Sequence, residues 1–286
     1  MDFAIKHIVV ICNETKDKEL LITNKVLDYL KDKVEDIKLF HTCWSGDLHA
    51  WTPIEEIPED TDIILVLGGD GTVMQVARSI YGRDIPLLGI NLGELGFLAE
   101  INCDKLEPAL DKLLSGDFMI EERIMLSGKI EAKDGDFNFI ALNDIVLSRA
   151  GSLHIVNFDV KMNGQLLKSY KADGCIVSTP TGSTGYNLSA GGPIIDPTSE
   201  NIVLTTVCAH DLFNKSVVLS ADKIVSFEVH EEKRSVDVLI EVTFDGCLKK
   251  RVELGDIIHI TKAPYTTKLV RLESISFIEI LQKKMK

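Results

Sequence analysis

Positive charge is scarce in this sequence. Lys and Arg number 31 against 44 Asp and Glu, which gives a formal net charge of −13. Binding to DNA or RNA needs clustered Lys and Arg against the phosphate backbone, so nucleic acid is not expected as a partner. A local basic pocket for a small phosphorylated ligand is still compatible with this balance.

Long apolar runs, a leader and paired cysteines are also missing. No segment approaches the roughly 18 uncharged apolar residues of a membrane span, so no membrane partner is expected. The start, Met1-Asp2-Phe3, does not have the pattern of a secretory signal. The six cysteines show no CxxC or other metal-like spacing. Small buried thiols in a reducing cytoplasm are the expected interpretation.

The first third of the chain alternates between strand-like and helix-like patterns. Uninterrupted apolar runs of this length are typical of strands covered on both faces, hence of a parallel sheet flanked by helices. The strand-like runs are residues 5–12, 37–43, 63–67 and 85–90, and helical spacing marks 18–33 and 73–80. The order predicts an open α/β sheet.

Near residue 120 the pattern changes. Up to about residue 262 many short apolar runs are separated by turn signals such as Asn163-Gly164 and Asp245-Gly246, and helical periodicity is scarce. We therefore predict an α/β domain over 1–120 and a β-rich domain over 121–262. The last segment, 263–286, contains another apolar stretch at 269–281 that could return to the first domain. Periodicity alone does not show whether it does.

The sharpest local signal is the run Gly68-Gly69-Asp70-Gly71-Thr72, directly after a strand of the buried type. A strand that leads through glycines into a helix start brings backbone N–H groups and the helix dipole to one point, which suits phosphate. Ligands bind at the carboxyl ends of strands in open α/β sheets. The alternative is a tight turn with Thr72 as the helix cap.

Two familiar phosphate-binding loops are absent. The sequence contains no GxxxxGK[ST], and no GxGxxG closes the first strand. Without a P-loop lysine the site needs another source of positive charge, most simply a divalent cation that bridges the donor phosphates.

A second signal is the segment 178–193, STPTGSTGYNLSAGGP, which is rich in hydroxyl groups and glycine. We interpret it as a flexible polar lining rather than a core element. Hydroxyl and backbone donors suit ribose and amide groups, and Tyr186 offers a stacking face. The alternative for 178–193 is an ordinary Ser/Thr/Gly loop. A second candidate, Asn143-Asp144, comes before an apolar run and also fits a simple turn.

Taken together, these motifs resemble those of the NAD kinase family. Residues 68–72 match its GGDGT element, and 91–98, NLGELGFL, resemble its NxGxLGFL. Asn143-Asp144 matches an Asn-Glu/Asp pair, and 178–193 resemble TPTGSTAYSLSAGGP nearly throughout. GGDGT alone is shared with lipid kinases and phosphofructokinases, whereas the combination is much more specific.

The resemblance implies a kinase that phosphorylates the adenosine 2′-hydroxyl of NAD to give NADP. The donor would be ATP or polyphosphate, together with Mg²⁺ or another divalent cation. The fold implied is an open α/β N-terminal domain and a β-rich, NAD-binding C-terminal domain, with the chain end returning to the first. Family members are usually homodimers or homotetramers.

The resemblance also implies roles for individual residues. Asp70 is the catalytic carboxylate near the acceptor hydroxyl, Gly71 contacts the substrate, and Phe97 lines the nucleotide pocket. Asn143 and Asp144 bind adenine and ribose groups. The other dinucleotide contacts implied are His154, Lys171, Asp173, Thr184, Gly185, Tyr186, Asn187, Leu188 and Ser189. No second acidic motif marks a metal ligand.

Three positions depart from the family pattern. Gly185 stands where Ala is frequent, and Lys171 stands where many members have Arg, which keeps the charge but loses the bidentate fork. Residues 208–212, CAHDL, replace a CPHSL-like element.

Two rival functions share part of this evidence. A lipid kinase of the diacylglycerol or sphingosine type also carries GGDGT, but it has no use for the hydroxyl-rich signature. A non-catalytic NAD-sensing module would keep the pocket around Asn143-Asp144, but it could dispense with Asp70.

Overall fold

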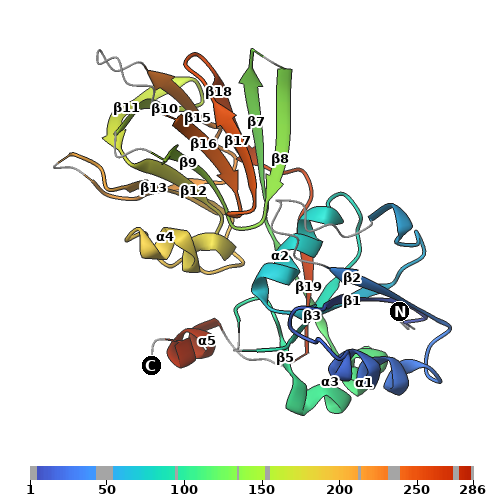
Figure 1. Ribbon diagram of the computed structural model, residues 1–286. Helices are drawn as coiled ribbons and strands as arrows, with labels where there is room; N and C mark the ends of the chain where they lie inside the picture. The colour runs from blue at the N-terminus through green and yellow to red at the C-terminus, as the bar shows by residue number, and fades with distance from the viewer. Residues whose placement is uncertain are drawn as a thin grey trace. The chain divides into compact units, whose positions relative to one another are not determined.

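The computed structural model describes residues 5–42, 54–93, 96–133, 135–151, 155–211, 214–230, 239–272 and 277–284. The chain divides into two compact units. The first unit comprises Met1–Glu122 and Thr267–Lys286, and the second comprises Arg123–Thr266. Figure 1 labels their helices and strands.

The first unit is built on a seven-stranded sheet in the order β2-β1-β3-β4-β19-β6, with β5 paired to β4. Its strands are β1 (His7–Asn13), β2 (Asp36–Thr42), β3 (Ile63–Gly68), β4 (Leu87–Asn91), β5 (Ile101–Asn102), β6 (Met119–Arg123) and β19 (Thr267–Arg271). Its helices are α1 (Leu21–Leu30), α2 (Asp70–Ser79), α3 (Leu106–Leu114) and α5 (Phe277–Lys284), with 3₁₀ turns at Ile54–Glu56 and Cys103–Lys105. The predicted α/β order is confirmed.

Helices cover both faces of this sheet. Val26 and Leu30 of α1 share one hydrophobic cluster with Leu110 of α3, and α2 lies on the other face (Figure 1). All six residues of β3 are buried, as the uninterrupted apolar run predicts. The chain end does return to this unit, because β19 pairs in parallel with β4.

The strand order reverses between β1 and β3. Both strands are parallel neighbours, but the chain moves from β1 outward to β2 and from β3 outward to β4 in the opposite direction. Such a reversal separates the loops at the carboxyl ends of the two strands and leaves a crevice where α/β proteins bind ligands. The glycine-rich run follows β3 at this point.

The second unit contains two six-stranded sheets, ordered β11-β10-β15-β18-β7-β8 and β14-β13-β12-β9-β16-β17. The first sheet comprises β7 (Leu126–Ala132), β8 (Gly135–Ala141), β10 (Val156–Met162), β11 (Gln165–Ala172), β15 (Val225–His230) and β18 (Ile257–Lys262). The second comprises β9 (Asp144–Ala150), β12 (Gly174–Ser178), β13 (Asn201–Val207), β14 (Val217–Ser220), β16 (Leu239–Phe244) and β17 (Leu248–Val252). A 3₁₀ turn, Thr181–Thr184, and the one-turn helix α4 (Tyr186–Ser189) complete it.

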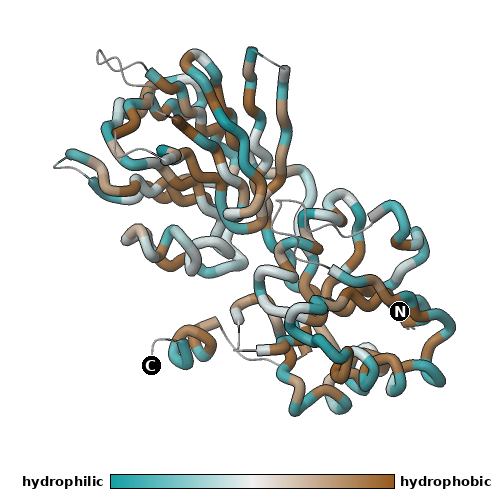
Figure 2. The backbone as a smooth tube through the Cα atoms, in the orientation of Figure 1, coloured by the Kyte–Doolittle hydropathy of each residue, from teal (hydrophilic) through white to brown (hydrophobic). Residues whose placement is uncertain are grey.

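The two sheets of the second unit enclose one hydrophobic core. Phe158, Phe227 and Phe244 are its largest fully buried side chains. Hydrophobic stretches alternate with polar ones along these strands, whereas the central strands of the first unit are more continuously hydrophobic (Figure 2). The predicted β-rich half is confirmed.

The cysteines only partly follow the prediction of buried thiols. Cys12 and Cys175 are buried, but Cys208 is exposed at the end of β13, and Cys43 lies outside the described residues. In the parts of the chain that the structure describes, no helix is long and apolar enough to cross a membrane.

Candidate active site

The glycine-rich run joins β3 directly to α2. Gly69 is the N-cap in an extended conformation, with φ −125° and ψ −173°, and no side chain caps the first turn. Gly68 is required by packing, because a Cβ there would lie 2.3 Å from Thr72 Oγ1. Nothing lies within 4 Å of the Cβ position at Gly71, so the start of α2 is open to a ligand.

Thr72 is not the helix cap that the alternative interpretation supposes. It is the third residue of α2, and its Oγ1 accepts a hydrogen bond of 3.0 Å from Asn13 Nδ2 at the end of β1. The hydroxyl therefore ties the glycine-rich run to the neighbouring strand.

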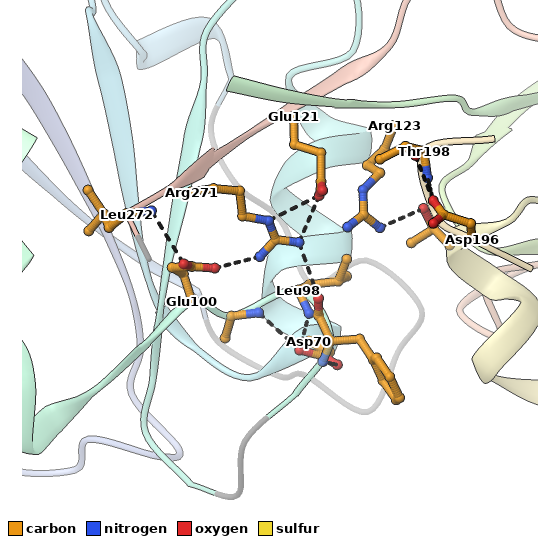
Figure 3. A network of polar contacts seen from close by, with 12 residues as sticks. Asp70, Leu98, Glu100, Glu121, Arg123, Asp196, Thr198, Arg271 and Leu272 are labelled. Carbon is orange, nitrogen blue, oxygen red and sulfur yellow. Dashed lines mark hydrogen bonds and ion pairs between the residues drawn. The ribbon is translucent and has the colours of Figure 1, made fainter. Parts of the chain in front are cut away.

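Asp70 is held by the backbone of the segment that follows β4. Its carboxylate accepts N–H groups from Phe97 at 2.7 Å, Leu98 at 3.1 Å and Ala99 at 3.2 Å (Figure 3). A Cβ at Gly96 would lie 1.8 Å from Asp70 Oδ1, so only glycine fits there. The family-type GDG and LGFL motifs, distant in sequence, thus form a single hydrogen-bonded unit.

A charged cluster supports this segment from the chain end. The Arg271 guanidinium lies between the carboxylates of Glu100, at 2.7 Å, and Glu121, at 2.9 Å (Figure 3). Its Nη2 also lies 3.5 Å from the Phe97 carbonyl oxygen. The Phe97 ring packs near Phe277 of α5, with ring centroids 6.2 Å apart. The C-terminal strand and helix therefore surround the residue expected to line a nucleotide pocket.

In the second unit, the Asn143-Asp144 pair is fixed by Asp245 in the β16–β17 turn. The Asp245 carboxylate accepts the N–H groups of Leu142 at 2.9 Å, Asn143 at 2.7 Å and Asp144 at 3.1 Å. The Asn143 backbone is also packed against Gly182, where a Cβ would lie 2.1 Å from the Asn143 carbonyl oxygen. Sequence reasoning treated Asp245-Gly246 only as a turn and missed this role.

The carboxyl group of Asp144 has an unusual environment. Only 5% of the residue is exposed. Burial and then the negative charge of Asp245 raise the pKa of Asp144 to about 7, because both disfavour the ionised form. Near neutral pH this side chain changes between hydrogen-bond donor and charged acceptor.

A cavity of about 400 Å³ lies in this unit, and two predicted site residues, Asp173 and Tyr186, line it. Tyr186 is 47% exposed, and burial of its hydroxyl, with lesser effects of Cys208, Asp144 and Asp173, raises its pKa. The hydroxyl therefore stays protonated and available as a donor. The cavity lining is Ser148, Arg149, Gly151, Asp173, Gly174, Tyr186 and Val207.

Arg149 is the charged cavity residue that sequence reasoning missed. Its Nε and Nη2 lie 2.9 and 3.1 Å from the two carboxylate oxygens of Asp173, which makes a bidentate pair. Backbone bonds from Asp173 N–H to Val207 and from Arg149 N–H to Asp173 lock the same strands together. A basic residue at the end of an apolar strand was the only sequence signal.

The prediction that 178–193 is a polar lining rather than a core element is wrong for five of its polar side chains, which are buried, whereas Tyr186 does line the cavity. The segment forms the 3₁₀ turn and α4, and many of its polar side chains are packed inside. Three of the buried hydroxyls donate to backbone carbonyls, as in Thr179 Oγ1 to Leu142 O at 2.6 Å and Ser183 Oγ to Pro180 O at 2.6 Å. The Thr181 hydroxyl accepts a hydrogen bond from Arg123 Nη1 at 3.1 Å. The buried polar side chains are those of Ser178, Thr179, Thr181, Ser183 and Asn187.

Residues of this segment face different surroundings. The Asn187 amide is fully buried and bonds Ser183 O, Pro193 O and the Thr205 hydroxyl, so its side chain serves the fold rather than a ligand. Tyr186, Leu188 and Ser189 are exposed, and Thr184 and Gly185 are partly exposed. A Cβ at Gly185 would lie 3.6 Å from Asn143 Nδ2, which places these two predicted site residues side by side.

Lys171 and His154 are the two remaining predicted site residues. Lys171 is exposed on β11, opposite Asn157 of β10, and its carbonyl accepts the His210 N–H at 2.8 Å. His154 lies outside the described residues. Among the residues that are described, no group of three or more His, Cys, Asp or Glu side chains is placed to hold a metal ion.

Family models match both parts of the chain. Residues 50–118 match the ATP-NAD kinase N-terminal domain, and residues 142–272 match the ATP-NAD kinase C-terminal domain.

Full-length relatives have the same family name. The chain is 42% identical over 281 residues to an NAD kinase of Agathobacter rectalis, covering 98% of this chain and 99% of that protein. It is 39% identical over 285 residues to an NAD kinase of Lachnoclostridium phytofermentans, again covering 98% and 99%.

Solved structures agree in fold. Yeast NADH kinase in complex with NADH superposes with a TM-score of 0.85 at 22% identity, covering 99% of this chain and 88% of that one. An NAD kinase from Archaeoglobus fulgidus in complex with ATP gives 0.75 at 23% identity, covering 96% and 98%.

Proposed function

We propose, because the chain belongs to the NAD kinase family, that it transfers the γ-phosphoryl group of ATP to the adenosine 2′-hydroxyl of NAD. The bond between the γ-phosphorus and the ADP oxygen breaks, a bond to the 2′-oxygen forms, and the hydroxyl proton leaves. The products are NADP and ADP. The observation that carries the proposal is full-length similarity to NAD kinases together with an anchored Asp70 beside an open helix start.

In the first unit, Asp70 is proposed to accept or orient the proton of the 2′-hydroxyl. A carboxylate has about four lone-pair sites, and three backbone N–H groups already use most of them. The remaining capacity suits one hydroxyl group, in an orientation that the backbone fixes. Phosphoryl transfer asks the protein mainly for such positioning and for charge neutralisation.

In the second unit, Asp144 and Asn143 are proposed to bind the nucleoside part of NAD. A carboxylate accepts two hydrogen bonds from vicinal ribose hydroxyls well, as acidic residues do in other dinucleotide sites. Tyr186 offers an exposed ring beside the cavity for stacking on a planar base. The Arg149–Asp173 pair holds the cavity wall in place.

The cation, Mg²⁺ or another divalent ion, is proposed to arrive bound to the donor phosphates. The described residues contain no cluster that would bind it by protein side chains alone. When bound, such an ion neutralises charge on the β- and γ-phosphates.

The lipid-kinase rival has no support beyond the shared GGDGT run, and the NAD-sensing rival has none beyond the pocket around Asn143-Asp144. Both family models are those of NAD kinase domains, and none of the relatives named above is a lipid kinase. A homodimer or homotetramer, a cytoplasmic location and the use of polyphosphate remain predictions.

The proposal is tested with purified protein, NAD, ATP and Mg²⁺, with NADP detected by an NADP-specific dehydrogenase. A parallel reaction offers diacylglycerol vesicles in place of NAD, and another replaces ATP by polyphosphate. NADP formation without lipid phosphorylation is the expected result. Lipid phosphorylation without NADP would overturn the assignment.

A further inference from the structure

The glycine-rich run has no cation of its own. It consists of three glycines, one threonine and Asp70, which adds a negative charge where a donor's phosphates would bind. A triphosphate needs nearby positive charge both to bind and to react. The divalent cation proposed above supplies part of that charge, and a basic side chain from another part of the chain can supply more of it.

Lys16, in the loop after β1, lies directly over this run. A methyl group built on Gly69 would lie 2.6 Å from Lys16 Nζ and 3.9 Å from Cε. Because β1 and β3 are parallel neighbours with Cys12 opposite Leu67, their two following loops leave the same edge of the sheet. The ammonium group thus lies at the N-cap of α2, at the point where the strand order reverses.

The backbone on both sides of Lys16 is anchored. Asn13 accepts the N–H groups of Lys16 at 3.0 Å and Asp17 at 3.1 Å through its carbonyl, while its side chain bonds Thr72. Asp17 is buried and accepts both the N–H and the hydroxyl of Thr23 at 2.8 Å. The lysine is therefore carried by a fixed turn, although its own side chain is exposed.

The charge of Lys16 is not used by an acidic neighbour. Within the described residues no carboxylate forms an ion pair with its ammonium group. An exposed lysine without a carboxylate partner, held over an uncapped helix start, is available to a phosphate.

We propose that Lys16 binds the phosphates of the phosphoryl donor at the 68–72 run and supplies the positive charge that this run lacks. The inference rests on the proposed function, since it names a further contact for the same donor. Lys16, from the β1–α1 loop, would contact the donor phosphates as the lysine of the phosphate loop does in P-loop proteins.

The first test compares Lys16→Met with Lys18→Met, an exposed lysine two positions along the same loop. Loss of a charged hydrogen bond predicts a rise of about tenfold or more in the KM for ATP with Lys16→Met. The KM for NAD should stay close to that of the wild type, and Lys16→Arg should recover much of the loss. Lys18→Met should behave as the wild type does.

A second test uses Gly69→Ala, whose added methyl group would occupy the place of the Lys16 ammonium. The Gly69 backbone is extended, so alanine is tolerated there. Both substitutions should disrupt the same contact between Lys16 and the donor phosphates. The KM for ATP of the double variant should therefore rise by a smaller factor than the product of the factors for the two single variants.

Calorimetric titration of each folded protein with Mg-ATP alone gives a readout that does not need turnover. If the wild type makes no NADP, the proposed function fails, and the titration still decides on Lys16. A Lys16→Met protein that binds ATP within about twofold of the wild type would overturn the inference. So would an equal loss of affinity with Lys18→Met.

Discussion

Asp245 accepts the backbone N–H of Asp144 on its carboxylate at 3.1 Å and returns its own N–H to the Asp144 carbonyl at 2.9 Å. Asp144 is the first residue of β9 and Asp245 lies in the β16–β17 turn, 101 positions apart in the chain. Their reciprocal bonds fix the direction of the Asp144 side chain, and they also bring a second negative charge close to it. Burial is the main reason why the pKa of Asp144 is raised, and the same contact that positions this carboxyl group adds to that effect.

The first prediction is that NAD binding depends on pH near neutrality. The pKa of Asp144 is raised to about 7, and only the ionised form accepts two ribose hydrogen bonds. The KM for NAD should then fall by about tenfold as the pH rises from about 6 to about 8, since the ionised fraction rises by that factor. Steady-state kinetics at saturating ATP measures this.

Asp144→Asn is the control for the pH effect. Its KM for NAD should be high and flat over the same range. The free energy of unfolding depends on pH in the opposite direction from NAD binding. A raised carboxyl pKa means that the folded state binds the proton more tightly than the unfolded state, so ionisation of Asp144 destabilises the fold. Stability due to Asp144 is full below about pH 4 and is lost as the pH rises through about 7. A KM profile in the wild type as flat as in Asp144→Asn would remove Asp144 from the ribose site.

Asp245→Asn should distinguish two effects of the Asp245 carboxylate, its hydrogen bonds to the 142–144 backbone and its charge near Asp144. Loss of the charge lowers the pKa of Asp144 only in part, since burial is the larger cause, so the midpoint of the KM profile should move to lower pH. One N–H of the 142–144 backbone would face an amide NH₂, at a cost of about 1–3 kcal/mol in the free energy of unfolding. Asp222→Asn, which removes an exposed charge from the same unit, should leave the midpoint unchanged and cost much less stability, because its ion pair with Lys223 is exposed to solvent.

Tyr186→Ala should weaken NAD binding by roughly 1–3 kcal/mol, the scale of one base–aromatic stack. The ring is 47% exposed at the cavity, so its loss should cost the fold little. Tyr186→Phe keeps the ring and should retain most of the affinity. Equal affinities for the alanine variant and the wild type, by titration calorimetry, would assign the ring to packing.

Arg271→Met should destabilise the first unit. The Arg271 side chain is 12% exposed, and its removal takes away the cation that lies between the Glu100 and Glu121 carboxylates. Breaking such a pair costs about 3–5 kcal/mol. Arg251→Met, whose side chain is 73% exposed, should cost less than about 1 kcal/mol. Urea unfolding of the two variants makes the comparison, and equal losses would contradict it.

The sequence predicts the central strands of the first unit better than it predicts the polar parts of the site. An uninterrupted apolar run such as β3 is typical of a strand that is buried on both faces, so few other structures fit it. The 178–193 segment was misjudged because its composition does not reveal that Ser183 and Thr179 bond nearby carbonyls. Lys16, Arg149 and Asp245 carry no motif, and their roles follow from pairing between distant strands.

The catalytic role of Asp70 is tested most directly by the rate of NADP formation in Asp70→Asn. Because three backbone N–H groups point at this carboxylate, the asparagine amide must face one of them, so about 1–3 kcal/mol of stability should be lost as well. Asp256→Asn is the matched control, since its buried carboxylate also accepts a backbone N–H, from Glu253 at 2.9 Å. Thermal melts identify a temperature at which both variants are folded.

At that temperature, kcat of Asp70→Asn should fall by about 10²–10⁴, with little change in either KM, because the lost interaction acts in the transition state. Asp256→Asn should lose stability but keep its kcat. A folded Asp70→Asn protein that retains more than about a tenth of the wild-type kcat would contradict the role of Asp70 as the group that accepts or orients the hydroxyl proton.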